Sequence, residues 1–263
     1  MKKSSGSSRS KKREIIAVTG KGGTGKTTLV AIMAKILASQ GFKVLAVDAD
    51  PPISLTYALG ATPVKTIAQI RAKMIEDPNE KRRIKDLAIE DVIADEAVID
   101  LDQLSLLIMG KSEGPGCFCS INELLKYGIS KLSQNFDFTL IDCEAGIEQI
   151  NRQVIDSINR MIMISDTSAK GLRTALYLNN LGNSYGVQGD YKKGLVINRA
   201  GKKEIPILEG KAREMNMDII GFIPEDHKIT EHDLFDRSIF DLPKNAPSFV
   251  AIHSILERQG ILS

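Results

Sequence analysis

The chain has 263 residues, of which 43% are hydrophobic and 26% charged, and its formal net charge is +2. This composition is ordinary for a globular protein, and the length allows one large domain or two small ones. No apolar run approaches the roughly 18 residues needed to cross a bilayer, and no apolar segment follows the basic N-terminus as a secretory signal requires. With three cysteines and no export signal, we expect a reducing, cytoplasmic setting without a disulfide framework.

The first 13 residues differ in composition from the rest of the chain. Residues 1–13 carry six basic side chains and no acidic one, mostly among serines, so we expect a disordered tail. An arm for nucleic acid or another anionic surface is one interpretation, and a solvated extension is the favoured one. The remaining 29 basic and 33 acidic side chains leave the body at −4, which argues against non-specific DNA binding.

Residues 20–27 read Gly-Lys-Gly-Gly-Thr-Gly-Lys-Thr, which fits the phosphate-loop pattern. An apolar run at 14–19 precedes this loop, and a helical pattern of apolar residues at 26–39 follows it. Backbone N–H groups of the turn and of the helix start surround phosphate oxygens, Lys26 should reach the β- and γ-phosphates, and Thr27 should bind Mg²⁺. The predicted nucleotide-binding residues of this segment are Gly20, Gly22, Gly23, Thr24, Gly25, Lys26, Thr27 and Thr28.

Apolar segments typical of strands alternate with helical patterns along most of the chain. Strands are predicted near 14–19, 43–48, 104–109, 137–142, 160–165, 194–198 and 218–223. Helices are predicted near 26–39, 66–76, 120–134, 147–158, 171–184, 204–214 and 247–259. The continuously apolar strands predict an α/β fold with a doubly wound, mostly parallel sheet of about seven strands and helices on both faces. We expect one domain over 14–263, with the charge-rich segment 76–100 as a helical or irregular excursion within it.

Carboxylates follow two of the predicted strands. The second strand ends in Asp48-Ala49-Asp50-Pro51, and the fourth ends at Asp142. Ligands of open α/β sheets bind at the carboxyl ends of the strands, so these side chains should face the Mg²⁺ and γ-phosphate held by the loop. Two such carboxylates on strands flanking the loop are a much stronger signal than either one alone.

The loop, with its additional Lys21, resembles the deviant Walker A motif of the MinD/ParA/nitrogenase-iron-protein superfamily. The resemblance implies ATPases that form nucleotide-sandwich dimers, in which Lys21 reaches the partner's phosphates. It also implies that Asp50 activates the attacking water and that Asp142 is the Walker B carboxylate. The residues that match the adenine-side elements of the superfamily are Asn198, Pro224 and Asp226.

A second motif lies at residues 112–120, where Cys117 and Cys119 stand one residue apart in a glycine-rich segment. Ser120 and Glu123 read as a capping box that opens the following helix, and thiols near a helix start have lowered pKa values. If the chain dimerises through this face, four sulfurs converge on a site suited to Zn²⁺, Ni²⁺ or an iron–sulfur cluster. The alternative is a pair of small buried hydrophobic residues, which the polar surroundings fit poorly.

The cysteine motif and the segment 142–149 resemble the CooC-type ATPases that mature the nickel site of carbon monoxide dehydrogenase. This resemblance implies Ni²⁺ or Zn²⁺ bound at the interface of an ATP-dependent homodimer, and nickel delivery to a client enzyme such as carbon monoxide dehydrogenase. Two features depart from the family: the basic N-terminal extension, and Gln149 where a histidine is common. Both leave the client uncertain. We expect neither membrane nor nucleic acid as a partner.

Three other functions stay open from the sequence. An ATP-dependent iron–sulfur reductase like the nitrogenase iron protein would need a second, distant cysteine, but Gln149 stands there and Cys143 is a poor substitute. A MinD/ParA-type positioning ATPase would need a basic amphipathic tail or surface patch, whereas the helix predicted at 247–259 is typical of core packing. The cysteine pair could also be a redox switch on the ATPase rather than a cargo site.

Overall fold

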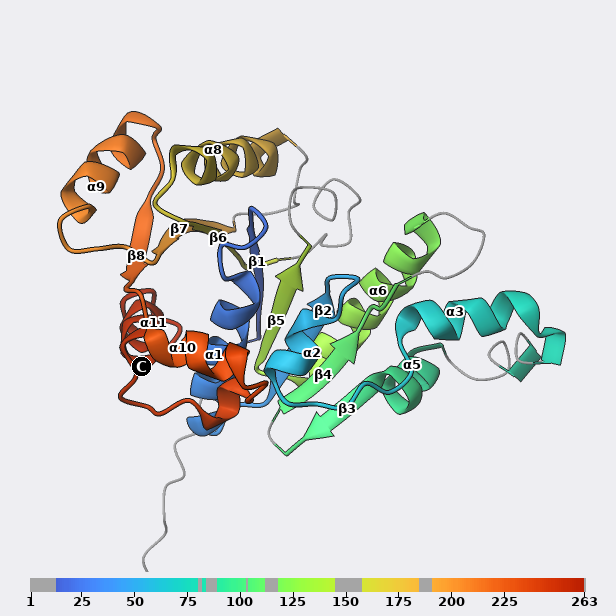
Figure 1. Cartoon of the computed structure of the whole chain (residues 1–263). Helices are drawn as coiled ribbons and strands as arrows, with labels where there is room; N and C mark the ends of the chain where they lie inside the picture. The colour runs from blue at the N-terminus through green and yellow to red at the C-terminus, as the bar shows by residue number, and fades with distance from the viewer. Residues whose placement is uncertain are drawn as a thin grey trace, which may run out of the picture.

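The computed structural model describes residues 13–79, 82–83, 89–102, 104–111, 118–144, 158–184 and 191–262. Eight strands form one sheet in the order β3-β4-β2-β5-β1-β6-β7-β8, parallel throughout except for the antiparallel edge pair β3–β4 (Figure 1). The strands are β1 (Glu14–Gly20), β2 (Val44–Ala49), β3 (Val98–Leu101), β4 (Leu104–Ile108), β5 (Phe138–Cys143), β6 (Arg160–Ser165), β7 (Lys192–Asn198) and β8 (Ile219–Ile223). The predicted fold class is confirmed.

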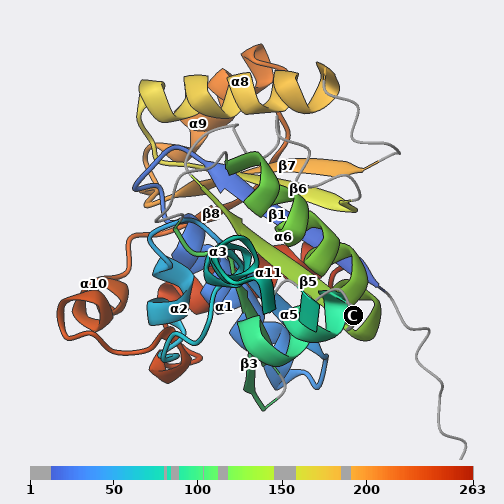
Figure 2. The ribbon, with the colours of Figure 1, turned by 90° about the vertical axis from the view of Figure 1, so that its right-hand side faces the viewer.

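Helices cover both faces of the sheet (Figures 1 and 2). One face carries α1 (Lys26–Ser39), α2 (Ser54–Ala58), α10 (His227–Leu234), the short 3₁₀ turn η2 (Ile239–Asp241) and α11 (Pro247–Arg258). The other face carries α3 (Ile67–Glu76), α5 (Ile89–Ala97), α6 (Phe118–Leu132), which continues into a 3₁₀ turn at Ser133–Asn135, α8 (Ala169–Ser184) and α9 (Ile205–Glu214). In Figure 2, α8 and α9 lie above β6 and β7.

Successive side chains of each strand point to opposite faces of the sheet, so a separate hydrophobic core forms on each face. On β1, the side chains of Ile16 and Val18 join the core with α1 and α11, whereas Ala17 joins the core with α6 and α8. All three residues are fully buried, as expected for a strand with a helical layer on either side. The phosphate loop follows β1 in the middle of this sheet, so its position is set by two packed cores.

The structure contains elements that periodicity did not predict. Strand β3 is a four-residue edge strand in the charge-rich segment 76–100, paired to β4 through a tight turn with Asp102 at φ 60. Helix α5 lies in the same segment, α2 has only five residues, and α10 is largely polar. Strand β3 and helix α2 are too short to carry a periodic signal, whereas α5 has an apolar side that buries Val92 and Ile93 and lies in the segment expected to be helical or irregular.

One predicted helix begins earlier than expected, and another falls outside the described residues. Helix α6 begins at Phe118 rather than at Ser120, so Ser120 lies inside the first turn. Helix starts are uncertain by one or two residues because several neighbouring positions can supply the first turn. The helix expected at 147–158 falls almost wholly outside the described residues. Among the helices that the structure describes, none combines the length and apolar character needed to cross a membrane.

Candidate nucleotide-binding site

The phosphate loop joins β1 to α1 in the arrangement that the sequence predicts. Gly20 is the last residue of β1, and α1 begins at Lys26. Gly25 precedes the helix with φ 97, a left-handed conformation that residues with a Cβ rarely adopt. Lys26 is only 7% exposed, so its ammonium group is held within the site rather than in bulk solvent. The loop and the N-terminal end of α1 therefore present backbone N–H groups and one buried cation together.

Asp142 lies at the end of β5, directly against the first turn of α1. The hydroxyl of Thr27 donates a hydrogen bond of 2.7 Å to Oδ2 of Asp142. The other carboxylate oxygen, Oδ1, is fully buried and has no hydrogen-bond partner among the described residues. Burial raises the pKa of Asp142 to about 7, while the bond from Thr27 and the charge of Lys26 oppose the shift. An orphaned carboxylate oxygen beside a threonine hydroxyl suits Mg²⁺, a cation that prefers oxygen ligands.

Two aspartates at the end of β2 have different surroundings. Asp48 pairs in register with Asp142 across β2 and β5 but directs Oδ2 to Thr56, whose N–H and hydroxyl donate at 2.9 and 2.8 Å. Asp48 therefore anchors α2, and burial raises its pKa to about 6. Asp50 is half-buried, and burial raises its pKa although the charge of Lys26 lowers it. Asp50 thus faces the loop, whereas Oδ2 of Asp48 is engaged with α2 and its Oδ1 is buried without a hydrogen-bond partner among the described residues.

A cavity of about 710 Å³ opens beside the loop, between α1, α2, α10 and the ends of β7 and β8. Its lining includes the loop residues Gly22, Gly23, Gly25, Lys26, Thr27 and Thr28. Asn198, Pro224 and Asp226, which lie far from the loop in the sequence, line the same cavity as Asp50. The structure therefore places these predicted nucleotide residues around one space large enough for a ligand.

Asp226 has a structural task at the wall of this cavity. Its Oδ1 accepts from the N–H of Lys228 and caps α10. Its Oδ2 accepts from both the N–H and the hydroxyl of Ser248, at 2.9 and 2.6 Å, at the start of α11. The buried carboxylate thereby ties the loop after β8 to two helices, which fixes the position of the neighbouring Pro224.

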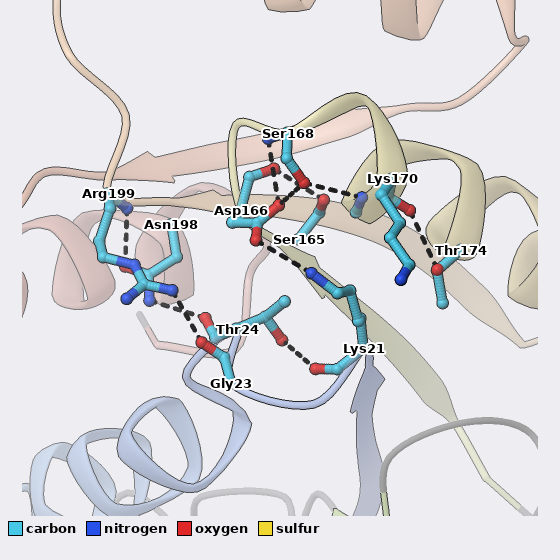
Figure 3. A network of polar contacts seen from close by, with 11 residues as sticks. Lys21, Gly23, Thr24, Ser165, Asp166, Ser168, Lys170, Thr174, Asn198 and Arg199 are labelled. Atoms are coloured by element: carbon cyan, nitrogen blue, oxygen red, sulfur yellow. Dashed lines mark hydrogen bonds and ion pairs between the residues drawn. The ribbon is translucent and has the colours of Figure 1, made fainter.

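Lys21 points away from the cavity. Its ammonium group lies 3.6 Å from Oδ2 of Asp166, directly after β6, as Figure 3 shows. Asp166 also accepts hydrogen bonds from the N–H and hydroxyl of Ser168 at the start of α8. Asp166 was not among the site residues predicted from the sequence. The sequence carries a pattern that could have identified Asp166, because this aspartate comes directly after an apolar strand.

Asn198 and Arg199, at the end of β7, reach the loop from the other side (Figure 3). Nδ2 of Asn198 donates to the carbonyl of Thr24 at 2.8 Å, and the guanidinium of Arg199 donates to the carbonyl of Gly23 at 2.7 Å. Thr24 is fully buried, and its hydroxyl donates to the carbonyl of Lys21 at 2.7 Å, which closes the turn. Arg199 was also missed, because an exposed arginine after a strand carries no pattern of its own.

The predicted soft-metal site falls largely outside the described residues. Cys117 and Gln149 belong to segments that the structure leaves undescribed, and of Cys119 only the backbone is described, in the first turn of α6. Among the residues described with side chains, no three or more His, Cys, Asp or Glu residues gather as a metal site. Cys143 is a free, buried thiol on β5 whose pKa burial raises, so it is unsuited to bind a metal as a thiolate.

Comparisons with known proteins agree with this geometry. An uncharacterised ATP-binding protein of Methanocaldococcus jannaschii is 33% identical over 248 residues, covering 93% of this chain and 97% of the relative. The carbon monoxide dehydrogenase accessory protein CooC of Rhodospirillum rubrum is 29% identical over 261 residues, covering 93% and 97%. The solved structure of the septum site-determining protein MinD from Pyrococcus horikoshii, complexed with Mg-ADP, matches with a TM-score of 0.68 at 24% identity, covering 94% and 97%.

A family model gives the assignment. The model described as the CobQ/CobB/MinD/ParA nucleotide binding domain matches residues 15–239, which include the phosphate loop and most of the cavity wall. The predicted ATPase class is confirmed, and the chain belongs to the CobQ/CobB/MinD/ParA nucleotide-binding domain family.

Proposed function

We propose that this ATPase is a metallochaperone: it dimerises on ATP and delivers nickel, or a related soft metal, to a metalloenzyme. The similarity to CooC, which extends over 93% of the chain, supports carbon monoxide dehydrogenase as the client. The observation that carries the proposal is the Cys117-x-Cys119 pair in the sequence, of which Cys119 lies in the first turn of α6. Helix α6 follows β4 in a parallel sheet, so this start belongs to the same edge of the sheet as the phosphate loop.

The start of a helix favours metal-binding thiolates. Cys119 lies in the first turn of α6, where backbone N–H groups lack helical partners and stabilise negative charge. Two such pairs, one from each protomer, supply four sulfurs for tetrahedral Zn²⁺ or for Ni²⁺. In the proposed cycle the ion is cargo, held in the closed ATP-bound dimer and released when hydrolysis opens it.

The phosphate site would supply the hydrolysis. Thr27 and Asp142 would hold Mg²⁺ next to the loop, directly or through water, and Asp50 would orient the attacking water. Bound Mg²⁺ neutralises charge on the β- and γ-phosphates. Lys26 binds these phosphates from its own chain, and Lys21 is proposed to reach the partner's phosphates. Turnover should be slow in the monomer, because that last cation is then missing.

Metal content tests the proposal. The full chain, purified anaerobically, should contain about one Ni²⁺ or Zn²⁺ per dimer, because four thiolates complete one tetrahedral site. Cys117→Ser with Cys119→Ser should lose the metal and keep ATP affinity. Cys143→Ala is the matched control, since it removes a buried thiol of raised pKa and should leave metal content unchanged. Metal retained by the double variant would contradict the cysteine site.

The same measurement separates the competing functions. Four irons per dimer would indicate an iron–sulfur reductase instead. ATP-driven dimers without any metal would indicate a positioning or redox-switched ATPase. The helix that would have to bind a membrane in a positioning ATPase, α11, buries Phe249, Ile252 and Leu256 in the core. This packing disfavours the positioning function.

Asp50→Ala tests the hydrolysis half of the cycle. Asp50 lines the cavity next to the loop, and its loss should trap the ATP-bound dimer with its metal. Metal release on ATP addition should then fail, while ATP binding persists. Hydrolysis at the unsubstituted rate would show that Asp50 does not orient the water.

A further inference from the structure

Two consecutive carbonyl groups of the phosphate loop are held from outside by two consecutive residues at the end of β7. Asn198 binds the carbonyl of Thr24, and Arg199 binds the carbonyl of Gly23, at 2.8 and 2.7 Å (Figure 3). We propose that Arg199 is a positioning residue of the phosphate loop: it fixes the turn at Gly23 and Thr24 while Asn198 orients the N–H of Gly25, so that the loop is held ready for the phosphates of ATP. The inference rests on nucleotide binding by the family and not on metal delivery.

Peptide geometry explains how an outside contact can orient an inside donor. The C=O and N–H groups of a trans peptide point in opposite directions, and no cis peptide occurs in the described chain. When Asn198 holds the carbonyl of Thr24, the N–H of Gly25 points away from Asn198. When Arg199 holds the carbonyl of Gly23, the N–H of Thr24 turns toward the carbonyl of Lys21, 3.4 Å away, and closes the turn.

The backbone conformation of Arg199 indicates that its contact with the loop offsets a local conformational cost. Arg199 has φ 56, a left-handed conformation that is unfavourable for residues other than glycine. In this conformation its N–H donates to Oδ1 of Asn198 at 2.9 Å, so the two side chains are oriented as one unit. A glycine would adopt the same φ at lower cost, but it could not reach the carbonyl of Gly23. Backbone strain of this kind gathers at functional sites.

The unit also packs closely on the loop. The Asn198 side chain lies so near Gly25 that a Cβ there would come within 2.4 Å of Nδ2. Arg199 lines the nucleotide cavity and is otherwise exposed to solvent. An exposed hydrogen bond contributes little to global stability, so the effect of Arg199 should be confined to the loop. The structure therefore predicts that nucleotide affinity and protein stability respond differently to the loss of this side chain.

Three substitutions separate positioning from a purely structural role. Arg199→Ala removes the contact, Arg199→Gly also relieves the left-handed backbone, and Arg199→Lys keeps a cationic donor. Arg213→Ala on α9 is the matched control, because Arg213 is an exposed arginine that does not line the cavity. Asn216→Gly relieves a second left-handed residue, at φ 51, away from the cavity. Each variant of the full chain is measured for Mg-ADP affinity, adenosine affinity by competition, KM and kcat for ATP, and Tm.

We expect Arg199→Ala and Arg199→Gly to weaken Mg-ADP binding by up to about fivefold, the size expected for one exposed contact of a charged side chain. KM for ATP should rise in parallel, while kcat changes less. Adenosine affinity should not change, because adenosine has no phosphate to bind the loop. Arg199→Gly should keep or raise Tm, as Asn216→Gly also should, and Arg199→Lys should recover part of the affinity. The control Arg213→Ala should match the unsubstituted chain.

Three results would overturn the proposal. Unchanged Mg-ADP affinity in Arg199→Ala would show that the contact with Gly23 does not position the loop. Equal losses of adenosine and Mg-ADP affinity would assign Arg199 to the base or ribose instead. A Tm that falls in Arg199→Gly together with affinity would assign it to folding. None of these results depends on whether the chain carries nickel, so a failure of the metal proposal remains distinguishable.

Discussion

The ammonium of Lys21 lies 3.6 Å from the carboxylate of Asp166 within one chain, on the side of the loop away from the nucleotide cavity. The two side chains are about a third and a quarter exposed. Lys21 is the residue that the superfamily resemblance assigns to the partner's phosphates. In the single chain its charge is already paired, so the proposed action of Lys21 across a dimer interface requires that this ion pair break first.

Asp166→Asn should therefore raise ATP-driven dimerisation. The substitution removes the charge that holds Lys21 but keeps an oxygen to accept from Ser168. Partly exposed pairs contribute up to about 1 kcal/mol each, and two such pairs break per dimer, so the dimer fraction at limiting concentration should rise by up to about thirtyfold. Analytical ultracentrifugation with ATP, in the Asp50→Ala background to prevent turnover, measures the change. Lys21→Ala is the opposing control, and equal dimerisation of Asp166→Asn and the unsubstituted chain would contradict the prediction.

The buried carboxylates predict that the stability of the folded chain depends on pH. Burial raises the pKa of Asp48 to about 6 and that of Asp142 to about 7, so the folded chain holds protons that the unfolded chain releases above pH 4 or so. The contribution of these groups to stability is greatest below that pH and falls as pH rises toward about 7. Mg²⁺ binding favours the ionised carboxylates and should offset the loss.

Thermal unfolding measures both effects. Without Mg²⁺, the Tm of the chain should decrease between about pH 5 and pH 7.5, relative to Asp142→Asn as a control. Mg-ADP should raise Tm more at the higher pH, because Asp142 is then ionised. A Tm increment from Mg-ADP that is equal at both pH values would show that Asp142 does not titrate in this range.

Gly25 should not tolerate a side chain. It has φ 97, and a Cβ would meet Nδ2 of Asn198 at 2.4 Å. Gly25→Ala should cost about 1–2 kcal/mol of stability from its backbone and weaken Mg-ADP binding by more than about tenfold, because the Asn198 contact with the loop is displaced. Gly41→Ala is the matched control: its φ is 82, and a Cβ there meets nothing within 4 Å. Gly41→Ala should lose stability but keep its Mg-ADP affinity. Chemical denaturation measures the stability of each variant, and calorimetry measures its affinity. Normal affinity in Gly25→Ala would contradict the packing argument.

A buried ion pair at the start of strands β1 and β6, at the opposite end of the strands from the phosphate loop, should affect stability but not nucleotide binding. Arg160 on β6 donates to Glu14 on β1 at 2.9 Å and to the side chain and carbonyl of Gln259, just after α11. Arg160 is 3% exposed, and Arg160→Ala removes the guanidinium that lies against the buried carboxylate of Glu14. The free energy of unfolding should fall by about 3–5 kcal/mol.

Replacement of both partners provides the control. Glu14→Leu with Arg160→Met removes both charges and should lose much less stability, because no unpaired charge is left in the core. Both proteins should keep their Mg-ADP affinity, since Glu14 stands at the start of β1 and the phosphate loop follows its end. Urea denaturation gives the stability, and a double variant as unstable as Arg160→Ala would show that packing rather than charge dominates this cluster.

Much of the fold follows from local sequence patterns. All seven strands predicted from apolar runs are present, because a strand buried on both faces must be apolar along its whole length. The phosphate loop was predictable residue by residue, since its glycines, Lys26 and Thr27 each answer a local requirement of phosphate binding. Strand β3 and helices α2 and α10 were not, because their few residues are held by contacts with distant elements.

Several sequence predictions stay predictions. The single domain over 14–263, the disordered tail at 1–13 and the roles of the individual site residues are of this kind. So is the metal site at Cys117 and Cys119, of which the structure describes only the backbone of Cys119. The metal measurement proposed above addresses that site directly.

The sequence by itself determined the fold class, the phosphate loop and the carboxylates at the strand ends, because these depend on residue type and spacing along one segment. The tertiary structure decided how those groups are divided between tasks. It turned Asp48 toward Thr56, paired Lys21 with Asp166, and engaged Asp226 with Ser248. The partners of each pair lie on different elements, and only the packing of the sheet and its two helical layers fixes which charge meets which donor.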